Sequence, residues 1–405
     1  MFFDLALVFL CIAAVSQFLY FLLITSNHKD FVKRYNRDFK EFRPKVLLTV
    51  PCKGLDMGFF RNILSLMRLD YENYNIHFVV ESESDPAYES LQRIIDRCRD
   101  DMPAGFAKVL VAGISKGYSQ KNHNLLHSLR FAPHDTEIYA FADSDTRVSR
   151  LWLAHLMYPL RNSKYGVSTG YRYFIPARRR FSNLALSSMN AAAAQIMGKS
   201  KYTTQVWGGS MAIRKELFEQ LNVANLWQKS ISDDLTLSAA VRNAGYKIRL
   251  MPRCFTVTFE DMSWGQLFEF GRRQMLITRV AYLRMWLWGL FCLLNHFLGV
   301  WILPVAAAVR FAMGENDAKL FAAAAVIHWA SLIYRTYMRR RTFEFVLGPY
   351  GGYVRQLSMW EFLLNPLWLA LMLALILISS FGRTICWRGV RYRLNGAFDI
   401  ERLNR

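Results

Sequence analysis

Two aspartates at the end of a short apolar run have the residue types and spacing of a cation site. Residues 138–142, IYAFA, are apolar, and Asp143-Ser144-Asp145 follows them directly. An apolar run this short predicts a buried strand, and alternate residues of an extended chain point to the same side. Carboxylates suit Mg²⁺ or Mn²⁺, which bind through one or two of them together with substrate phosphates. We expect Asp143 and Asp145 to hold such a cation; a solvated turn or helix cap is the alternative.

A second acidic pair opens a predicted helix. Asp233 and Asp234 begin the stretch DDLTLSAAV, directly after Ser232. Ser232 or Asp233 would cap this helix, and acidic residues favour a helix N-terminus in any case. Two adjacent acids beside a bound diphosphate would also raise the pKa of one of them toward the range of a general base. Both interpretations of this acidic pair, a helix cap and a general base, remain open.

A segment rich in aromatic and basic residues, 264–288, precedes a long apolar run. Its pattern predicts an amphipathic helix at a membrane interface, with arginines reaching toward water. Arg272 and Arg273 within it are candidates to clamp a leaving diphosphate.

A glycine pair beside an aromatic residue is the last candidate. Trp207-Gly208-Gly209 lies in the stretch QVWGGSMAIRKELF. Two glycines predict a tight turn. The turn would serve as a platform for a sugar or an acceptor, or it would only join a strand to a helix.

The residues between about 45 and 260 alternate in pattern. The short apolar runs KVLLTVP, NIHFVVES, AKVLVAGI and EIYAFADSD are separated by the amphipathic stretches 58–67, 86–99 and 120–129. Such alternation predicts an α/β domain with a mostly parallel sheet covered by helices. Ligands bind at the carboxyl ends of strands in these sheets, where Lys53, residues 81–85 and Asp143 fall. No phosphate-binding G-x-x-x-x-G-K-[ST] loop is present in the sequence, so its pattern does not indicate ATP hydrolysis.

The composition indicates a membrane protein. The 405 residues are 53% hydrophobic and carry a formal net charge of +20. The basic residues cluster beside apolar segments, which favours an anionic lipid surface over nucleic acid. Residues 2–24 are apolar and long enough to cross a bilayer. The basic stretch 27–45 then places the N-terminus outside and the following chain in the cytoplasm.

Three more apolar segments lie late in the chain, at 286–309, 320–333 and 362–381. We expect an anchor at 1–25, a basic juxtamembrane segment at 26–44, and a cytoplasmic catalytic domain at 45–260. An interfacial segment at 261–284, a transmembrane region at 285–382 and a basic tail at 383–405 follow. Four spans place the tail outside, whereas its charge favours the inside, so its side stays open. The six cysteines form no CxxC pair and indicate neither zinc nor disulfides.

The motifs together resemble the inverting, membrane-bound glycosyltransferases of the family 2 type, and most closely the ceramide glucosyltransferases. PCKGLD and LDYENYNIHFVVESESDPA are similar to that group's first block, SQKNHNLL to its Lys-x-Asn-Asn-Leu stretch, and FADSDTRV to its metal motif. GGSMAIRKELF resembles the acceptor-side loop, SDDLTLSAAV the block that carries the base, and TICWRGVRYRL the closing Trp-Arg-x-x-Arg-Tyr stretch. The resemblance runs nearly end to end.

The resemblance implies a GT-A, Rossmann-like nucleotide-sugar domain with transmembrane and interfacial amphipathic helices. It also implies a role for each matching residue. Asp234 would be the catalytic base, and Asp143 and Asp145 would hold Mg²⁺ or Mn²⁺. The nucleotide sugar would contact Lys53, Asp85, Lys121, Asp143, Asp145, Arg273 and Gln274. The acceptor or sugar side would hold Trp207, Gly208, Gly209 and Asp233. The Gln/Arg-x-x-Arg-Trp motif of the family is not intact, because no Trp follows an Arg at the right step in RRQMLITR.

The implied reaction moves a sugar, glucose from UDP-glucose in the first instance, to the hydroxyl of a membrane lipid such as ceramide and forms a β-glycolipid. The sugar stays open between glucose, galactose and N-acetylglucosamine. Other acceptors also remain open: diacylglycerol, a hopanoid lipid, a sterol or polyprenyl phosphate. A processive polysaccharide synthase and a non-catalytic lipid-binding membrane protein are the rival functions. The expected location is a bacterial inner membrane or its equivalent.

Overall fold

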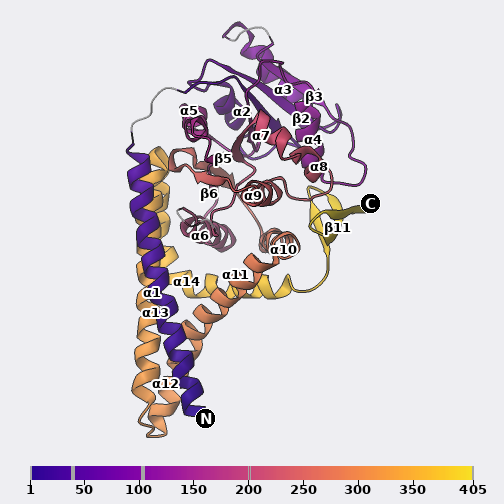
Figure 1. The fold of residues 1–405 in the computed structure, drawn as a ribbon. Helices are drawn as coiled ribbons and strands as arrows, with labels where there is room; N and C mark the ends of the chain where they lie inside the picture. The colour runs from indigo at the N-terminus through magenta and orange to yellow at the C-terminus, as the bar shows by residue number, and fades with distance from the viewer. Residues whose placement is uncertain (1, 38–41, 102–104, 199, 201, 404–405) are drawn as a thin grey trace.

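The structure, a computed structural model, describes residues 2–37, 42–101, 105–198, 200 and 202–403. An α/β domain lies at one end of a group of long helices (Figure 1). The expected juxtamembrane segment and basic tail include residues 38–41 and 404–405, which lie outside the described residues.

A seven-stranded sheet forms the centre of the α/β domain. The inner strands are buried runs of mostly apolar residues, as expected for a sheet covered on both faces, whereas the edge strands are partly exposed. Only the seventh strand of the chain runs antiparallel to its neighbours within this sheet. In spatial order the strands are β3 (Ala107–Val111), β2 (Tyr74–Val80), β1 (Val46–Pro51), β4 (Ile138–Ala142), β7 (Ser210–Arg214), β5 (Tyr165–Thr169) and β8 (Lys247–Leu250). The expected mostly parallel sheet is confirmed.

Two apolar clusters cover the two faces of this sheet. The first joins its strands to α2 (Phe59–Met67), α3 (Pro86–Arg97) and α5 (Trp152–Met157). The second joins them to α4 (Gln120–Leu129), α7 (Lys215–Gln220), α8 (Val223–Trp227) and α9 (Asp233–Asn243). The helices therefore hold the carboxyl ends of β1, β2 and β4 at one edge of a rigid scaffold.

A short parallel pair, β6 (Arg172–Pro176) and β9 (Thr256–Glu260), extends the domain toward the long helices. Helix α6 (Phe181–Ile196) follows β6 and packs against it. Apolar residues of β6, β9 and α6 share one cluster with Phe31 and Phe343 of the long helices. Arg34 also donates a hydrogen bond of 2.8 Å to the carbonyl of Leu250 at the end of β8. The helices are thus fixed to the sheet by packing and by a buried cation.

The long helices include the segments that were expected in a membrane. They are α1 (Phe2–Tyr35), α10 (Trp264–Ala281), α11 (Leu283–Phe297), a π-helical turn (Leu298–Ile302), α12 (Leu303–Ala312), α13 (Ala318–Val346) and α14 (Gly351–Ile378). Within the described residues, Leu10–Tyr35, Leu283–Ala312 and Gly348–Ile378 are long and apolar enough to cross a bilayer. The short apolar run 320–333 is the first half of α13, which packs against α12 and α1. The protein has the helices of an integral membrane protein.

The end of the chain folds into a small antiparallel sheet of β10 (Thr384–Trp387), β11 (Val390–Gly396) and β12 (Asp399–Leu403). Arg388 and Gly389 join the first two strands, and both have positive φ angles of 50° and 78°. A two-residue turn of this kind matches the twist of a hairpin. The sheet lies against the α/β domain (Figure 1), where Arg402 donates to Gln120 at 3.0 Å. The tail is therefore on the same side as the α/β domain.

Candidate active site

The centre of the site is a lysine between two carboxylates. Lys121 lies in the first turn of α4, and Asp143 directly follows β4. The Lys121 ammonium lies 2.9 Å from Asp143 and 3.1 Å from Asp233. Asp145 lies 3.7 Å from the guanidinium of Arg172, which extends from β6. The structure thus brings together both acidic pairs and the lysine that the sequence singled out.

The ionisation of these carboxylates follows their burial and their neighbours. Burial, followed by the charge of Asp143, raises the pKa of Asp145 to about 7. Burial alone would raise the pKa of Asp143, but the ion pair with Lys121 lowers it overall. Burial raises the pKa of Asp233 to about 6; Lys121 opposes this change, and the charges of Asp234 and Asp143 add to it. The site therefore favours a further cation near Asp145.

The two glycines of the Trp207-Gly208-Gly209 turn leave room for the charged groups. A Cβ atom on Gly208 would lie 2.1 Å from Oδ2 of Asp233 and 2.8 Å from Nζ of Lys121. A Cβ atom on Gly209 would lie 2.7 Å from Oδ2 of Asp143 and also collide with the Trp207 ring. Distances below 3 Å leave no space for a side chain. The turn is therefore part of the site wall, and close approach explains both glycines.

Asp234 lies at the N-terminus of α9 and is more accessible than its neighbour. Ser232 caps the helix by accepting a hydrogen bond from the Leu235 amide. One Asp234 oxygen accepts hydrogen bonds from Ser232 and from the Leu235 amide, and the other lies 3.2 Å from the Gly208 amide. Asp233 is 3% exposed, whereas Asp234 is only partly buried. The helix start therefore holds one acid inside the charge network and one at its open side.

The ends of β1 and β2 bring a second group of predicted residues to the same edge. Lys53 forms an ion pair of 2.8 Å with Glu81. Asp85 caps α3 by accepting from the Ala87 amide at 2.9 Å, and it also accepts from the Gly54 amide at 2.8 Å. Asp85 thus ties the loops after β1 and β2 together.

The C-terminal hairpin contributes an arginine to this edge. Arg388, at the hairpin tip, lies 2.7 Å from Asp56 and donates to the Lys53 carbonyl at 3.3 Å. Burial opposes its charge, but Asp56, Asp145 and Asp143 together raise the pKa of Arg388. A residue near the end of the chain therefore joins the site built by the first half of the domain.

Of the three α10 candidates, one lies near the site and two lie away from it. Arg272 donates to the carbonyls of Thr384 and Phe381 instead of facing the carboxylates. Arg273 donates to the Cys386 carbonyl at 3.4 Å and lies 5.5 Å from the centre of the Trp387 ring. Burial and the charge of Arg172 lower the pKa of Arg273 to about 10. Gln274 is exposed, and no contact joins its side chain to the site in the described structure. Arg273 therefore stays a candidate for an anionic ligand, with less support for Gln274.

The donor atoms fit a hard divalent cation. In the described part of the chain, no group of three or more His, Cys, Asp or Glu side chains is placed to hold a metal ion by itself. Oδ1 of Asp145 is buried and has no hydrogen-bond partner among the described residues. Two carboxylates with an unsatisfied oxygen match Mg²⁺ or Mn²⁺ bound jointly with phosphates.

Three charged residues of this edge were absent from the sequence prediction: Asp56, Arg172 and Arg388. Asp56 and Arg388 lie within quoted motifs, PCKGLD and TICWRG, so the motifs carried a signal for both. Glu81, by contrast, was expected at the end of its strand, and its ion pair with Lys53 lies at this edge. Arg172 lies in the stretch GYRYF. The alternation of residue types in this strand gives no sign that Arg172 pairs with Asp145 across the site.

The known proteins that this chain resembles are described as glycosyltransferases. The family model described as glycosyl transferase family 21 matches residues 8–398. A curated relative, the probable glycosyltransferase YdaM of Bacillus subtilis (strain 168), is 22% identical over 241 residues, 58% of this chain. The matched part is 54% of that relative, so this chain spans about half of its length.

Two solved structures are also similar. A mannosyltransferase from Pyrobaculum calidifontis, in complex with GDP-Man and Mn²⁺, is 15% identical with a TM-score of 0.45 and covers 92% of this chain and 97% of its own. A structure of GalNAc-T7 with UDP, GalNAc and Mn²⁺ is 12% identical with a TM-score of 0.40. The match covers 58% of this chain and 52% of that chain. The seven-stranded sheet of this chain, with its single antiparallel strand, is GT-A-like, as expected.

Proposed function

Because this chain belongs to glycosyl transferase family 21, we propose that it moves glucose from UDP-glucose to the hydroxyl of a membrane lipid such as ceramide, with inversion at the sugar. The observation that carries the proposal is the junction of Lys121, Asp143, Asp233 and Gly208 at one edge of the sheet. Ligands bind at this edge in α/β sheets.

The donor side of the proposal rests on charge. Asp143 and Asp145 would hold Mg²⁺ or Mn²⁺, which neutralises charge on a leaving diphosphate. Lys121, Arg172 and Arg388 already surround the carboxylates with cations. Guanidinium groups bind phosphate oxygens in two-point contacts. Asp85, between the loops after β1 and β2, would contact the uridine.

The acceptor side rests on Asp234. This carboxylate is partly open, and its position at the helix start is fixed by the Ser232 and Leu235 contacts. Asp234 would accept the proton of the attacking lipid hydroxyl. The hydroxyl oxygen then bonds to the anomeric carbon while the bond to the diphosphate breaks on the opposite face. Asp233, buried against Lys121, would position the base rather than act as one.

A lipid acceptor matches the long apolar helices attached to the domain. Moving a lipid chain into water costs about 0.8 kcal/mol per CH₂. A site that works on such a lipid must therefore meet it at the bilayer surface, where α10 and the helices beside it connect to the α/β domain.

The test uses the purified full-length protein in vesicles, radiolabelled UDP-sugars and a panel of lipids: ceramide, diacylglycerol, a hopanoid lipid, a sterol and polyprenyl phosphate. Glucosylceramide as the labelled product supports the proposal. Label in polyprenyl-linked sugar, in a polymer, or in no product at all contradicts it.

Asp234→Asn tests the base. General-base assistance contributes about 10²- to 10⁴-fold to rate, so turnover should fall by that factor while UDP-sugar binding, measured by calorimetry, is kept. Asp100→Asn, at an exposed position in the same domain, is the control and should match the wild type. An Asp234→Asn protein with wild-type turnover would show that another group takes the proton.

A further inference from the structure

Helix α14 is apolar enough to cross a bilayer, yet both of its ends contact the same side of the molecule. At its start, Tyr350 and Tyr353 pack against Phe259 of β9, with ring centres 6.1 and 6.2 Å apart. After its end, Arg272 of α10 donates to the Phe381 carbonyl at 3.1 Å. The chain then enters β10 and the sheet that lies against the α/β domain.

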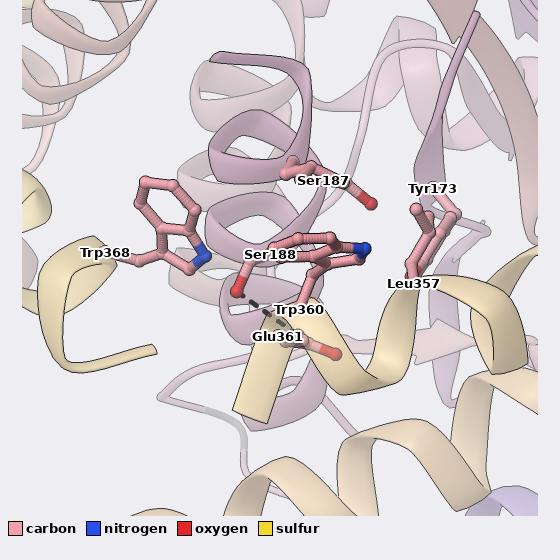
Figure 2. Close-up of a pocket in the computed structure, with 8 residues that line it drawn as sticks. Tyr173, Ser187, Ser188, Leu357, Trp360, Glu361 and Trp368 are labelled. Carbon is pink, nitrogen blue, oxygen red and sulfur yellow. Dashed lines mark hydrogen bonds between the residues drawn. The ribbon is translucent and has the colours of Figure 1, made fainter. Parts of the chain in front are cut away.

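The middle of α14 also follows the α/β domain. Glu361 accepts a hydrogen bond of 3.2 Å from Ser188 of α6, at a small pocket lined mainly by residues of these two helices (Figure 2). The same Glu361 oxygen also forms a buried ion pair of 2.6 Å with Arg339 of α13. The first half of α14 runs antiparallel along α13, where Arg355, Glu361 and Asn365 contact Glu344, Arg339 and Thr336. The later, labelled part of α14 in Figure 1 lies crosswise to α1 and α13, beneath the domain. A helix held along its length in this way does not point through a bilayer.

The contact with α13 gives the level at which α14 crosses. Asn365 of α14 donates to Thr336 of α13, one turn before Arg339. The part of α13 beyond this crossing, from Ala318 to Arg335, would measure about 27 Å at the rise of an α-helix. A bilayer core is about 30 Å thick. Helix α14 therefore turns crosswise to α13, next to Pro366, at the level where the apolar layer would end on the side of the α/β domain.

One face of α14 is apolar and has no partner among the residues that the structure describes. Met359, Leu363 and Leu367 are 71%, 66% and 50% exposed, and their spacing of four residues places them on one stripe. Trp360, 44% exposed, packs against Phe181, which is 54% exposed, with ring centres 6.1 Å apart. The exposed arginines 178–180 precede Phe181. Apolar and aromatic side chains beside exposed cations are typical of a surface that meets anionic headgroups.

We propose that α14 lies in the membrane surface on the side of the α/β domain instead of crossing the bilayer. Its stripe of Met359, Leu363 and Leu367 enters the headgroup boundary of that leaflet. The crossings are then α1, the α11–α12 segment and α13. This arrangement removes the conflict between span count and charge, because three crossings leave the basic C-terminal sheet on the side of the domain. The proposed position of α14 requires only a bilayer as partner and does not depend on which sugar or acceptor the enzyme uses.

The first test labels single cysteines in sealed vesicles with a membrane-impermeant maleimide. Cys11 and Cys386, the native cysteines that are not buried, are replaced by serine in the full-length protein. Gly352→Cys and Ser380→Cys then mark the two ends of α14; the side chain at 352 would meet no neighbour. Lys116→Cys marks the α/β domain, and Met313→Cys marks the α12–α13 connection.

The proposal expects labels at 352 and 380 from the same side as the label at 116, and from the opposite side to the label at 313. Labelling of 352 and 380 from opposite sides would overturn it. A second measurement places a spin label at Leu363→Cys and compares its depth with a label at Val15→Cys on the exposed face of α1. A label at 363 near the boundary supports the surface position, and one as deep as the bilayer centre contradicts it.

Discussion

A single lysine holds the acidic residues of the site together before any ligand is bound. Lys121 contacts Asp143 from the metal-type motif and Asp233 from the helix start. Removing one member of a buried ion pair leaves an unpaired charge, which costs about 3–5 kcal/mol. The same network forces glycine at position 208, because its Cβ would occupy the place of the Asp233 carboxylate.

At the residue scale we predict that Gly208→Ala lowers turnover by about 10²-fold, the effect of a displacement of about 1 Å at a reacting centre. The added methyl must push Asp233 or Lys121 aside, whereas the sheet beneath is unaffected. Steady-state kinetics and a thermal melt of the purified variant check this prediction. Gly265→Ala, on α10 with no atom near the new methyl, is the matched control. Equal activity of both variants would mean that the turn does not border the reacting groups.

The C-terminal hairpin is the element that brings a distant residue to the site. Val390, Tyr392 and Leu394 are buried and alternate with exposed Arg391 and Arg393, so one face of β11 packs on the protein. Ile385 of β10 joins the same cluster as Leu276 of α10. This packing fixes the position of the β10–β11 turn, which places Arg388 next to Asp56.

At the element scale we predict that Arg388→Ala raises the KM for the nucleotide sugar about tenfold or more, since a charge-assisted hydrogen bond contributes about 1.5–3 kcal/mol. The Lys variant should recover only part of the loss, because it lacks the two-point geometry of a guanidinium. Initial rates at varied donor concentration measure both effects. Arg393→Ala removes an exposed ion pair on the next strand and should leave KM unchanged. A KM for Arg388→Ala equal to that of the control would assign the arginine to structure alone.

At the scale of the whole molecule, stability depends on buried polar groups beneath the sheet edge. His77 of β2 is 1% exposed and lies 3.0 Å from the Ser128 hydroxyl, which also bonds Thr49 of β1 at 2.8 Å. Burial, with help from the charge of Lys108, lowers the pKa of His77 from 6.5 to about 4. Above pH 6.5 both the folded and the unfolded chain hold this histidine neutral. Between pH 6.5 and 4 only the unfolded chain takes up the proton.

We therefore predict that stability falls as the pH drops from 6.5 toward 4. One pKa unit corresponds to about 1.4 kcal/mol, so His77 would contribute about 3 kcal/mol of this loss near pH 4. Thermal unfolding of the full-length protein in detergent across this range measures the slope. His77→Asn should flatten the slope, while exposed His134→Asn should keep it. An unchanged slope in the first variant would place the acid sensitivity in other groups.

Much of this molecule follows from local pattern. The four apolar runs noted in the sequence became β1 to β4 in the expected parallel arrangement. The polar residues that follow them met at one edge because parallel strands end together. The acidic start of α9 was also expected, since Ser232 is a favoured cap. Arg272 and Gln274 are expected residues that lie apart, because a helix presents only part of its surface to one neighbour.

The sequence by itself determined the α/β order, the apolar helices and the acidic pairs, because burial and strand or helix period act over a few neighbouring residues. Tertiary structure alone decided that Lys121 bridges Asp143 and Asp233, that Arg388 reaches Asp56, and that α14 lies along the domain. Each of these contacts joins residues far apart in the chain. The energies of these contacts depend on the distance between the charges and on the dielectric around them in the folded state. Neither quantity can be read from the local composition of the sequence.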